Sequence, residues 1–370
     1  MAEYKVNWYN PKQQQLSILS NFVSLEYAWA ENSIGVLKLV FPIDMYSNSW
    51  VARDAFFAVY RDNVLEMNTI WFLRKIEYAD EAGTVTLIAY SANYIFGDPE
   101  NRAGRIVISE AGNTTYSEFQ DYADDIIKTL ASQNVGLGAL DTERDLSNYL
   151  TIAAKDSAGP IVSKSCSKAL LLPLFQEICE SARQEGTPIY FDIVCTRLPY
   201  AEYSLQLELR TYIQQRGFDL RDTIVVSKER GNISNALLTI DYGSEITTCY
   251  AAGSGEGALQ PQEEYSDTTR LGASAFNRRE AYIEVSSTAD EDVLISSAKE
   301  VVALGKPKLK FSGNLIETPS FRYGIDWNFG DRIKAYSHGY TFDARISAIS
   351  LRVSNESEAI EVNILGESDL

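Results

Sequence analysis

The C-terminal segment of this chain alternates apolar and polar side chains with a period of two, and this pattern constrains the fold more than any other feature. The alternation meets a turn at His338-Gly339, continues through 340–349, turns again at 354–357 and ends with 359–364. A period of two places every second side chain on the same face of an extended strand. The pattern therefore predicts antiparallel strands that turn one face toward a core.

A similar unit occurs near the N-terminus. Segments 55–60, 69–78 and 84–90 alternate in the same way, and Tyr60 corresponds to Tyr336 when the two units are compared. The shorter strand-like segments that precede them complete a sheet that can close on itself. We therefore predict a β-rich α+β fold with two similar small antiparallel β-barrels.

The middle of the chain has helical periodicity instead. Thr115–Glu118 is a capping-box sequence, and the apolar residues after it recur at helical spacing until Gly136, where the helix is expected to end. A second helix carries its apolar face on 174–182, with Pro173 in its first turn, because a proline inside a helix costs about 3 kcal/mol. Strand-like segments follow, so this part reads as an inserted α+β domain.

The chain becomes strand-rich again after Phe218. The polar segment Pro261–Phe276 reads as a flexible loop, and a second capping box, Thr288–Glu291, opens a helix that is expected to stop at Gly305. The predicted division is a first barrel at 1–100, an α+β middle domain at 101–217, a second barrel formed by 218–246 together with 306–370, and an inserted strand, loop and helix segment at 247–305.

Composition limits the class of protein. Hydrophobic residues are 45% and charged residues 23% of the 370 residues, which is ordinary for a globular protein. No apolar run approaches the roughly 20 residues that span a bilayer, and the start lacks the features of a signal peptide, so we expect synthesis in the cytoplasm and no membrane insertion. Fifty-one acidic and 33 basic residues give a net charge of −18, which disfavours binding to nucleic acid.

Residues that could form a metal or cofactor site are scarce, so we expect no cofactor, no metal and no catalytic residues. The one histidine, His338, reads as a turn residue, and Gly253–Gly257 lacks the lysine and hydroxyl residue of a phosphate-binding loop. Cysteines show no metal-ligand spacing and read as small buried residues in a reducing compartment; they are Cys166, Cys179, Cys195 and Cys249. Adjacent acids such as Asp124 and Asp125 are expected on a solvated face.

One motif carries a resemblance to a known family. Before the three-strand ending, the chain reads Gly-x-Asp-Trp-Asn-x-Gly-Asp-Arg, and this stretch resembles the hub proteins at the tip of bacteriophage tails. The hub family includes the baseplate hub of contractile phages and the short tail-associated protein of long, non-contractile ones. The candidate structural or interface residues of the motif are Gly324, Asp326, Trp327, Gly330 and Asp331.

The resemblance implies a function as well as a fold. In that family two homologous barrels per subunit let a homotrimer present a pseudo-sixfold ring to a hexameric tail tube. It implies a virion protein of the tail tip, with the distal tail protein ring, the tail tube, the tape measure protein and tail fibres or receptor-binding proteins as partners. A trimer would carry three times −18, or −54, and DNA could pass such an acidic wall without specific binding.

Two other classes of function stay open on sequence grounds. The chain holds 22 tyrosines, 15 phenylalanines and five tryptophans, and exposed aromatic residues would suit a carbohydrate-binding β-protein that recognises host glycans. A glycoside hydrolase would need two carboxylates facing each other across a cleft, which adjacency in sequence does not provide. We expect a structural protein that is not an enzyme.

Overall fold

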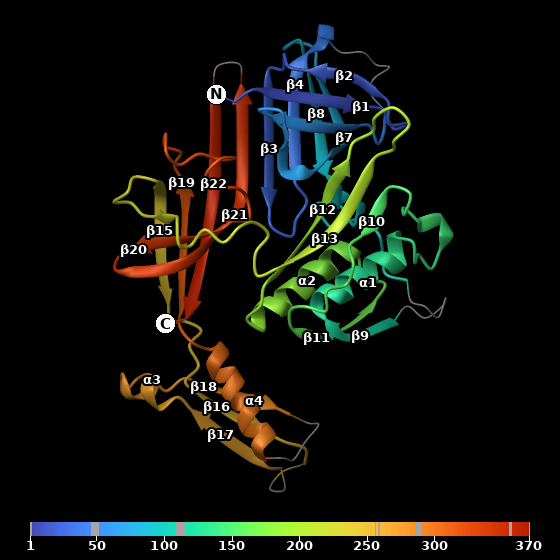
Figure 1. The fold of residues 1–370 in the computed structure, drawn as a ribbon. Helices are drawn as coiled ribbons and strands as arrows, with labels where there is room; N and C mark the ends of the chain where they lie inside the picture. The colour runs from blue at the N-terminus through green and yellow to red at the C-terminus, as the bar shows by residue number, and fades with distance from the viewer. Residues whose placement is uncertain are drawn as a thin grey trace. The chain divides into compact units, whose positions relative to one another are not determined.

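The computed structural model describes residues 2–45, 52–108, 116–255, 257, 260–285, 291–354 and 357–369 (Figure 1). The chain forms two compact units. Unit 1 comprises Met1–Thr223, Leu315–Arg332 and Arg345–Asn363, and unit 2 comprises Ile224–Asn314, Ile333–Ala344 and Ile364–Leu370. The four-part division predicted from the sequence stays a prediction.

An antiparallel sheet forms the first part of unit 1. Its strands and short 3-10 turns are β1 (Tyr4–Tyr9), β2 (Gln15–Leu19), β3 (Ser24–Ala30), β4 (Val36–Pro42), η1 (Ile43–Met45), β5 (Phe56–Arg61), β6 (Val64–Leu65), η2 (Glu66–Asn68), β7 (Trp71–Ala79), β8 (Thr84–Ser91) and η3 (Ala92–Ile95). The order is β3-β4-β8-β7-β5-β1-β2, and the C-terminal part of β21 (Tyr340–Ser354) pairs with β3. The alternating segments predicted in this region are confirmed as strands.

The core of this sheet follows from the period of two. Leu25, Tyr27 and Trp29 on β3 are buried while the residues between them are half-buried or exposed. Trp8 and Trp71 are buried too, so these tryptophans belong to the core of the sheet. Among the described strands no sheet closes into a barrel, so the β-rich class is confirmed and the two-barrel arrangement stays a prediction.

The remainder of the N-terminal part of unit 1 is mixed. It contains β9 (Tyr116–Tyr122), α1 (Ala123–Val135), η4 (Thr142–Arg144), β10 (Leu150–Ile152), β11 (Ile161–Ser167), α2 (Leu171–Gln184), β12 (Ile189–Arg197) and β13 (Gln206–Ile213). Strands β10, β13 and β12 form one sheet, and β9 pairs with β11. Helices α1 and α2 lie side by side next to these sheets (Figure 1).

The end of α1 and the position of Pro173 in α2 were predicted correctly, but the predicted start of α1 was wrong. Helix α1 stops before Gly136, and Pro173 lies in the first turn of α2, as predicted. The helix expected after the Thr115–Glu118 capping box does not begin there, because 116–122 form β9, which pairs antiparallel with β11 along its whole length. Sheet pairing outweighs the local helix signal, and Thr115 itself lies outside the described residues.

The acid pair Asp124 and Asp125 is buried, so its expected place on a solvated face was wrong. Lys128, one turn further along α1, lies 3.3 Å from Asp124 and 2.7 Å from Asp156, and it donates a 2.7 Å hydrogen bond to the carbonyl of Ala154. Asp125 accepts hydrogen bonds from the backbone and hydroxyl of Ser157. The charged residues therefore hold loop 154–158 against α1.

Two buried asparagines join β12 to the N-terminal sheet. Asn32, in the β3–β4 turn, donates to the Ile189 carbonyl at 3.1 Å and accepts from the Phe191 N–H at 2.9 Å. Asn93 on η3 accepts from the Ile193 N–H at 2.8 Å. These side-chain amides take the place of a neighbouring strand along the edge of β12, and a paired edge resists association with other chains.

Asn93→Ala is expected to lower the free energy of unfolding by about 2–3 kcal/mol, because it leaves buried backbone groups without a partner. The Asn93 amide also donates to the Ser33 carbonyl at 2.8 Å, so the loss affects both sides of the junction. Urea unfolding would measure the effect. Asn10→Ala is the control, since the hydrogen bonds of Asn10 with the described residues stay within its own exposed turn, and equal losses in the two variants would contradict the role given to Asn93.

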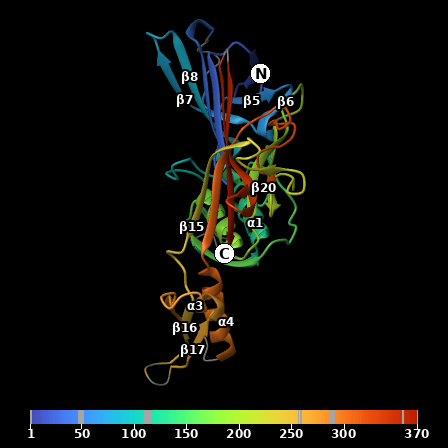
Figure 2. The same ribbon diagram turned by 90° about the vertical axis from the view of Figure 1, so that its left-hand side faces the viewer.

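Unit 2 contains two sheets. Its elements are β14 (Val225–Val226), β15 (Ile233–Asp241), β16 (Thr248–Ala252), β17 (Gln262–Ser266), α3 (Thr268–Gly272), β18 (Glu280–Glu284), α4 (Glu291–Leu304), β19 (Lys308–Leu315), β20 (Arg332–Ser337) and β22 (Glu358–Asp369), and β19, β20, β21 and β22 also contribute residues to unit 1. The strands in the order β15-β19-β22-β21-β20-β14 belong to the same sheet as β3, which pairs with β21, and the other sheet has the order β17-β16-β18. Helix α4 covers one face of the second sheet (Figure 2).

Three predictions from the sequence can be compared with the structure of unit 2. His338 and Gly339 both have positive φ, 49° and 87°, and connect β20 to β21, which confirms the turn. The helix predicted to stop at Gly305 ends at Leu304, although Thr288 of its capping box lies outside the described residues. The prediction of a flexible loop at Pro261–Phe276 was wrong, because this segment contains β17 and α3.

Segment 261–276 is polar because one face of the sheet that contains β17 is exposed to solvent, and this composition led to the wrong prediction of a loop. Glu264 of β17 points to solvent, whereas Tyr265 packs against the α4 side of the sheet. Asp267 then caps α3 by accepting hydrogen bonds from the N–H groups of Thr269 and Arg270. No described helix is long and apolar enough to cross a membrane.

Candidate functional site

The predicted motif lies in unit 1 as a tight irregular turn. Gly324 has a φ of 78°, and its N–H donates to the Trp327 carbonyl at 2.9 Å. The Asp326 carboxylate accepts from the Arg322 N–H at 2.8 Å. These bonds close the turn on itself, which is why glycine and aspartate are needed at these two positions.

Trp327 is the centre of the turn. Its side chain is 0% exposed, and its ring centroid lies 5.6 Å from that of Phe321 and 5.3 Å from that of Tyr323. The side chain therefore locks the turn from inside. Whether the motif also belongs to a subunit interface stays a prediction.

Asp331 ties the motif to a second loop. One carboxylate oxygen accepts from the Phe218 N–H and the other from the Asn328 N–H, both at 2.7 Å. Burial raises the pKa of this carboxyl, although both backbone hydrogen bonds oppose the shift. Gly330, with a φ of 86°, accepts a hydrogen bond from the Gly217 N–H through its carbonyl. Segments 216–218 and 328–331 are thus fixed to each other.

A buried polar cluster, not found from the sequence, supports the same turn. The Tyr323 hydroxyl donates a short hydrogen bond to Glu66. Arg61 donates to the Tyr323 carbonyl at 3.0 Å and pairs with Glu358 at 3.1 Å, and Glu358 also accepts from the Tyr4 hydroxyl at 2.7 Å. No sequence signal marks these residues, because they come from distant positions and meet only in the folded chain.

A hollow of about 500 Å³ opens beside this cluster. Gly324 and Asp331 of the motif line it, whereas Asp326 and Trp327 do not. Three large apolar side chains in its lining are strongly exposed: Val64 at 68%, Phe218 at 71% and Ile325 at 63%. Exposed apolar side chains on a rigid support are typical of protein contact surfaces.

The carboxylates of the hollow serve structure. Glu66 accepts from Tyr323, both oxygens of Asp331 accept from backbone N–H groups, and Asp62 accepts from the Glu3 N–H. In the part of the chain that the structure describes, no three histidine, cysteine or acidic residues are placed to hold a metal ion. Cys179 and Cys249 are buried and Cys195 half-buried, while the side chain of Cys166 lies outside the described part.

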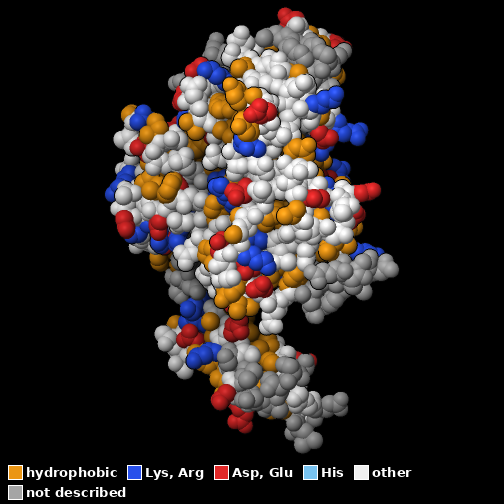
Figure 3. Space-filling view, turned by 45° about the vertical axis from the view of Figure 1, so that its right-hand side comes forward, with side chains coloured by type: hydrophobic (Ala, Val, Ile, Leu, Met, Phe, Trp, Pro, Cys, Tyr) orange, Lys and Arg blue, Asp and Glu red, His pale blue; other side chains and the backbone are white. Residues whose placement is uncertain are grey.

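Charged side chains of both signs mix on one face of the molecule. On the face in Figure 3, acidic and basic side chains of the described residues are interspersed, with apolar patches between them. A nucleic-acid site would gather lysine and arginine on one surface. That the chain does not bind nucleic acid stays a prediction from its net charge.

Glu66→Gln is expected to change how stability depends on pH. Burial raises the pKa of Glu66 above its ordinary 4.5, against the opposing hydrogen bond from Tyr323, so the folded chain binds this proton more tightly than the unfolded one. Relative to Glu66→Gln, the natural protein should therefore gain stability as pH falls from neutral toward 4.5. Urea unfolding at several pH values measures this.

Glu358→Gln is expected to change the pH dependence of stability in the opposite direction. Burial acts to raise the pKa of Glu358, but hydrogen bonds from the Ala2 N–H, Tyr4 and Arg61, together with the charge of Arg61, lower it overall. Relative to Glu358→Gln, the natural protein should lose stability as pH falls through that lowered pKa. Slopes of the same sign in the two comparisons would refute this assignment.

Comparison with known proteins shows which family the sequence matches and which solved structures share the fold. The model of the Siphovirus ReqiPepy6 Gp37-like protein family matches residues 6–364. No curated protein matches the sequence. The prophage tail protein gp18 from Listeria monocytogenes EGD-e is similar in structure, with a TM-score of 0.52 at 12% identity, over 98% of this chain and 94% of that one.

Two further solved structures share the fold. A tail protein from Neisseria meningitidis MC58 has a TM-score of 0.53 at 12% identity, over 99% of this chain and 97% of that one. The 43 kDa tail protein of prophage MuSo2 from Shewanella oneidensis has a TM-score of 0.52 at 8% identity, over 97% and 98%. At these identities the likeness concerns the fold.

Proposed function

Since this chain belongs to the Siphovirus ReqiPepy6 Gp37-like protein family, a family of siphovirus tail proteins, we propose that it is the structural hub at the distal end of a phage or phage-derived tail. The observation that carries the proposal is the family match over nearly the whole chain. The folds shared with three tail proteins over nearly their full lengths support it. A hub of this kind joins the tail tube to the tip and gates the exit of tape measure and DNA.

The hub is a homotrimer in this proposal. Two similar barrels, at 1–100 and at 218–246 with 306–370, would give a trimer six similar units around its axis. Six such units match a tube built from hexameric rings, which resolves the difference in symmetry between the two assemblies. The α+β middle domain and the 253–276 region would face the tip.

The net charge supports passage of DNA. A trimer carries three times −18, or −54. An acidic channel wall repels the phosphate backbone, whereas clustered lysines and arginines would retain it. DNA therefore passes without specific binding.

The apolar hollow is the proposed contact with a neighbouring subunit. Val64, Phe218 and Ile325 supply exposed apolar surface, and the motif and the buried cluster hold them in place before binding. A surface that is already ordered loses little conformational entropy on association. The motif residues Gly324, Asp326, Trp327, Gly330 and Asp331 then act on assembly by fixing this surface.

Light scattering after size exclusion tests the trimer. We expect a mass of three times 41.3 kDa, about 124 kDa, and a threefold ring with a central hole in negative-stain images. Phe218→Asp with Ile325→Asp should shift the mass to that of a monomer without unfolding the chain. Leu137→Asp is the control, because Leu137 is even more exposed, at 86%, but lies outside the hollow. A monomer of the natural chain at every concentration would contradict the proposal.

The remaining parts of the proposal concern partners and place. The hub would sit at the tail tip of the virion, in contact with the distal tail protein ring, the tail tube, the tape measure protein and tail fibres or receptor-binding proteins. It has no enzymatic activity of its own in this proposal. Co-purification of the chain with a distal tail protein ring from the same tail would support the placement.

A further inference from the structure

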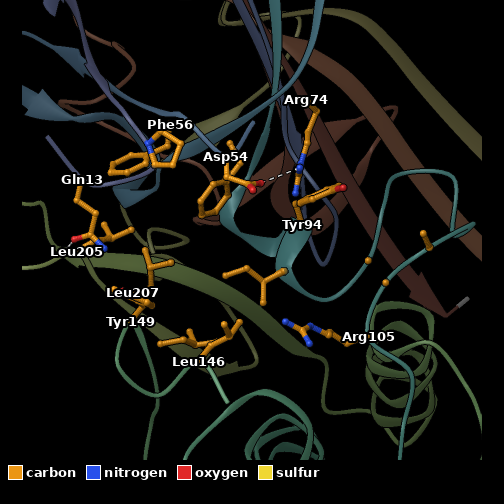
Figure 4. Close-up of a pocket in the computed structure, with 17 residues that line it drawn as sticks. Gln13, Asp54, Phe56, Arg74, Tyr94, Arg105, Leu146, Tyr149, Leu205 and Leu207 are labelled. Atoms are coloured by element: carbon orange, nitrogen blue, oxygen red, sulfur yellow. Dashed lines mark hydrogen bonds and ion pairs between the residues drawn. The ribbon is translucent and has the colours of Figure 1, made fainter. Parts of the chain in front are cut away.

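A second cavity in unit 1 has a different chemistry from the hollow. It measures about 670 Å³, within the range of ligand-binding sites, and lies between the N-terminal sheet and the sheet that contains β10 and β13 (Figure 4). We call it the cleft. Its lining comprises Pro11, Gln13, Asp54, Phe56, Phe72, Arg74, Tyr94, Ile95, Gly97, Ala103, Gly104, Arg105, Leu146, Tyr149, Leu150, Leu205 and Leu207.

The inner wall of the cleft is apolar. Phe56 on β5, Leu150 on β10 and Leu207 on β13 are buried and line the cavity, with Leu205 beside them. Leu146 is half-buried on the same side. A ligand that fills this space gains the transfer free energy of its apolar surface, about 25 cal/mol per Å².

Most polar groups around the cleft already have partners. Arg74 pairs with Asp54 at 2.9 Å, and its guanidinium carbon lies 4.1 Å from the centroid of the Tyr94 ring. Gln13 accepts a hydrogen bond from the Leu205 N–H at 2.7 Å through its side-chain oxygen. These groups shape the cleft and leave it little unused hydrogen-bonding capacity.

Arg105 is different. Its guanidinium points toward the cavity in Figure 4, and it forms no ion pair or side-chain hydrogen bond with any residue in the described part of the chain. Its backbone is fixed, because its N–H donates to the Phe96 carbonyl and its carbonyl accepts from the Leu171 N–H. A cation is thus held at the cleft without a counter-charge from any residue that the structure describes.

A second cation, Arg144, lies close to Arg105 in the fold, and the charge of Asp141 opposes the effect of Arg105 on it. Arg144 donates to the Ile106 carbonyl at 2.6 Å, and its pKa is lowered, first by burial and then by the positive charge of Arg105. Arg105 therefore lines the apolar cleft, and Arg144 lies next to the backbone that follows Arg105 without lining the cleft itself. In a chain of net charge −18, such a place selects an anionic group.

We propose that the cleft binds an amphipathic carboxylate, a molecule with an apolar body and one anionic head. The apolar body lies against Phe56, Leu150 and Leu207, and the carboxylate pairs with the guanidinium of Arg105. A single-chain fatty acid has this chemistry. The inference goes beyond the hub function and does not depend on it, since the isolated chain can be tested in any oligomeric state.

Calorimetric titration with decanoate, below its micelle concentration, tests the cleft. We expect saturable binding of one decanoate per chain, and we expect Arg105→Gln to weaken it about 10-fold or more. Binding of 1-decanol, which has the same chain without the charge, should not respond to Arg105→Gln. Leu146→Trp, which fills the cleft, should weaken the binding of both molecules.

Arg102→Gln is the matched control. Arg102 lies on the same loop, pairs with Asp98 and Glu100, and does not line the cleft, so its loss should leave decanoate binding unchanged. Arg105 has no side-chain partner among the described residues, so its variant is expected to fold like the natural protein, which circular dichroism would verify. Absence of saturable decanoate binding, or equal effects of the two arginine substitutions, would overturn the proposal.

Discussion

Lys128→Met is expected to lower the free energy of unfolding by about 3–5 kcal/mol, because it leaves a buried carboxylate without its counter-charge. Lys128 is 1% exposed in its side chain and Asp124 is 0% exposed. Methionine keeps the length of the side chain but can neither neutralise Asp124 nor donate to the Ala154 carbonyl. Urea unfolding at neutral pH measures the loss.

Two controls separate charge from packing. Lys75→Met removes an ion pair with Glu77 that is exposed on both sides, and it should leave stability nearly unchanged. Adding Asp124→Asn to Lys128→Met removes the uncompensated charge and should recover part of the loss. If Lys128→Met were as mild as Lys75→Met, the ion pair would not stabilise the loop in the way described.

Gly330→Ala is expected to destabilise the chain by about 2–5 kcal/mol, through left-handed backbone strain and a steric collision together. With φ at 86°, a Cβ atom at this position would lie 2.8 Å from the Cβ of Arg216. Arg216 pairs with the buried Asp192, so it cannot move aside without disturbing that pair. Thermal and urea unfolding would both show the effect.

Gly339→Ala isolates the collision. Gly339 has a φ of 87°, nearly that of Gly330, but nothing lies within 4 Å of its added Cβ. This variant should cost only the backbone strain, about 1–2 kcal/mol. Equal losses at the two glycines would mean that the contact between Gly330 and Arg216 contributes nothing.

The strands of the N-terminal sheet could be predicted because their signal is local. Leu25, Tyr27 and Trp29 face one side, and a period of two records this in the sequence whatever the strand pairs with. The same holds for the turn at His338-Gly339 and for the end of α1 at Gly136. These features depend on backbone sterics and on neighbours a few residues away.

Where the pairing of strands determines the local structure, the predictions from the sequence were wrong. Residues 116–122 carry part of a capping box but form β9, because β11 offers a full set of hydrogen bonds to that segment. Segment 262–266 is polar but forms β17, because only one face of its sheet is covered by α4. Asp124 and Asp125 look like surface residues until Lys128 and loop 154–158 enclose them.

For the candidate site, the sequence by itself determined the turn at Gly324 and Asp326, because both positions are set by local backbone geometry. Only the tertiary structure decided what surrounds it. Arg61 and Glu358 are 297 residues apart, yet they meet beneath this turn. A hydrogen bond or ion pair between distant segments leaves no periodic trace in the chain, so the buried cluster and the cleft exist only once the sheets have packed.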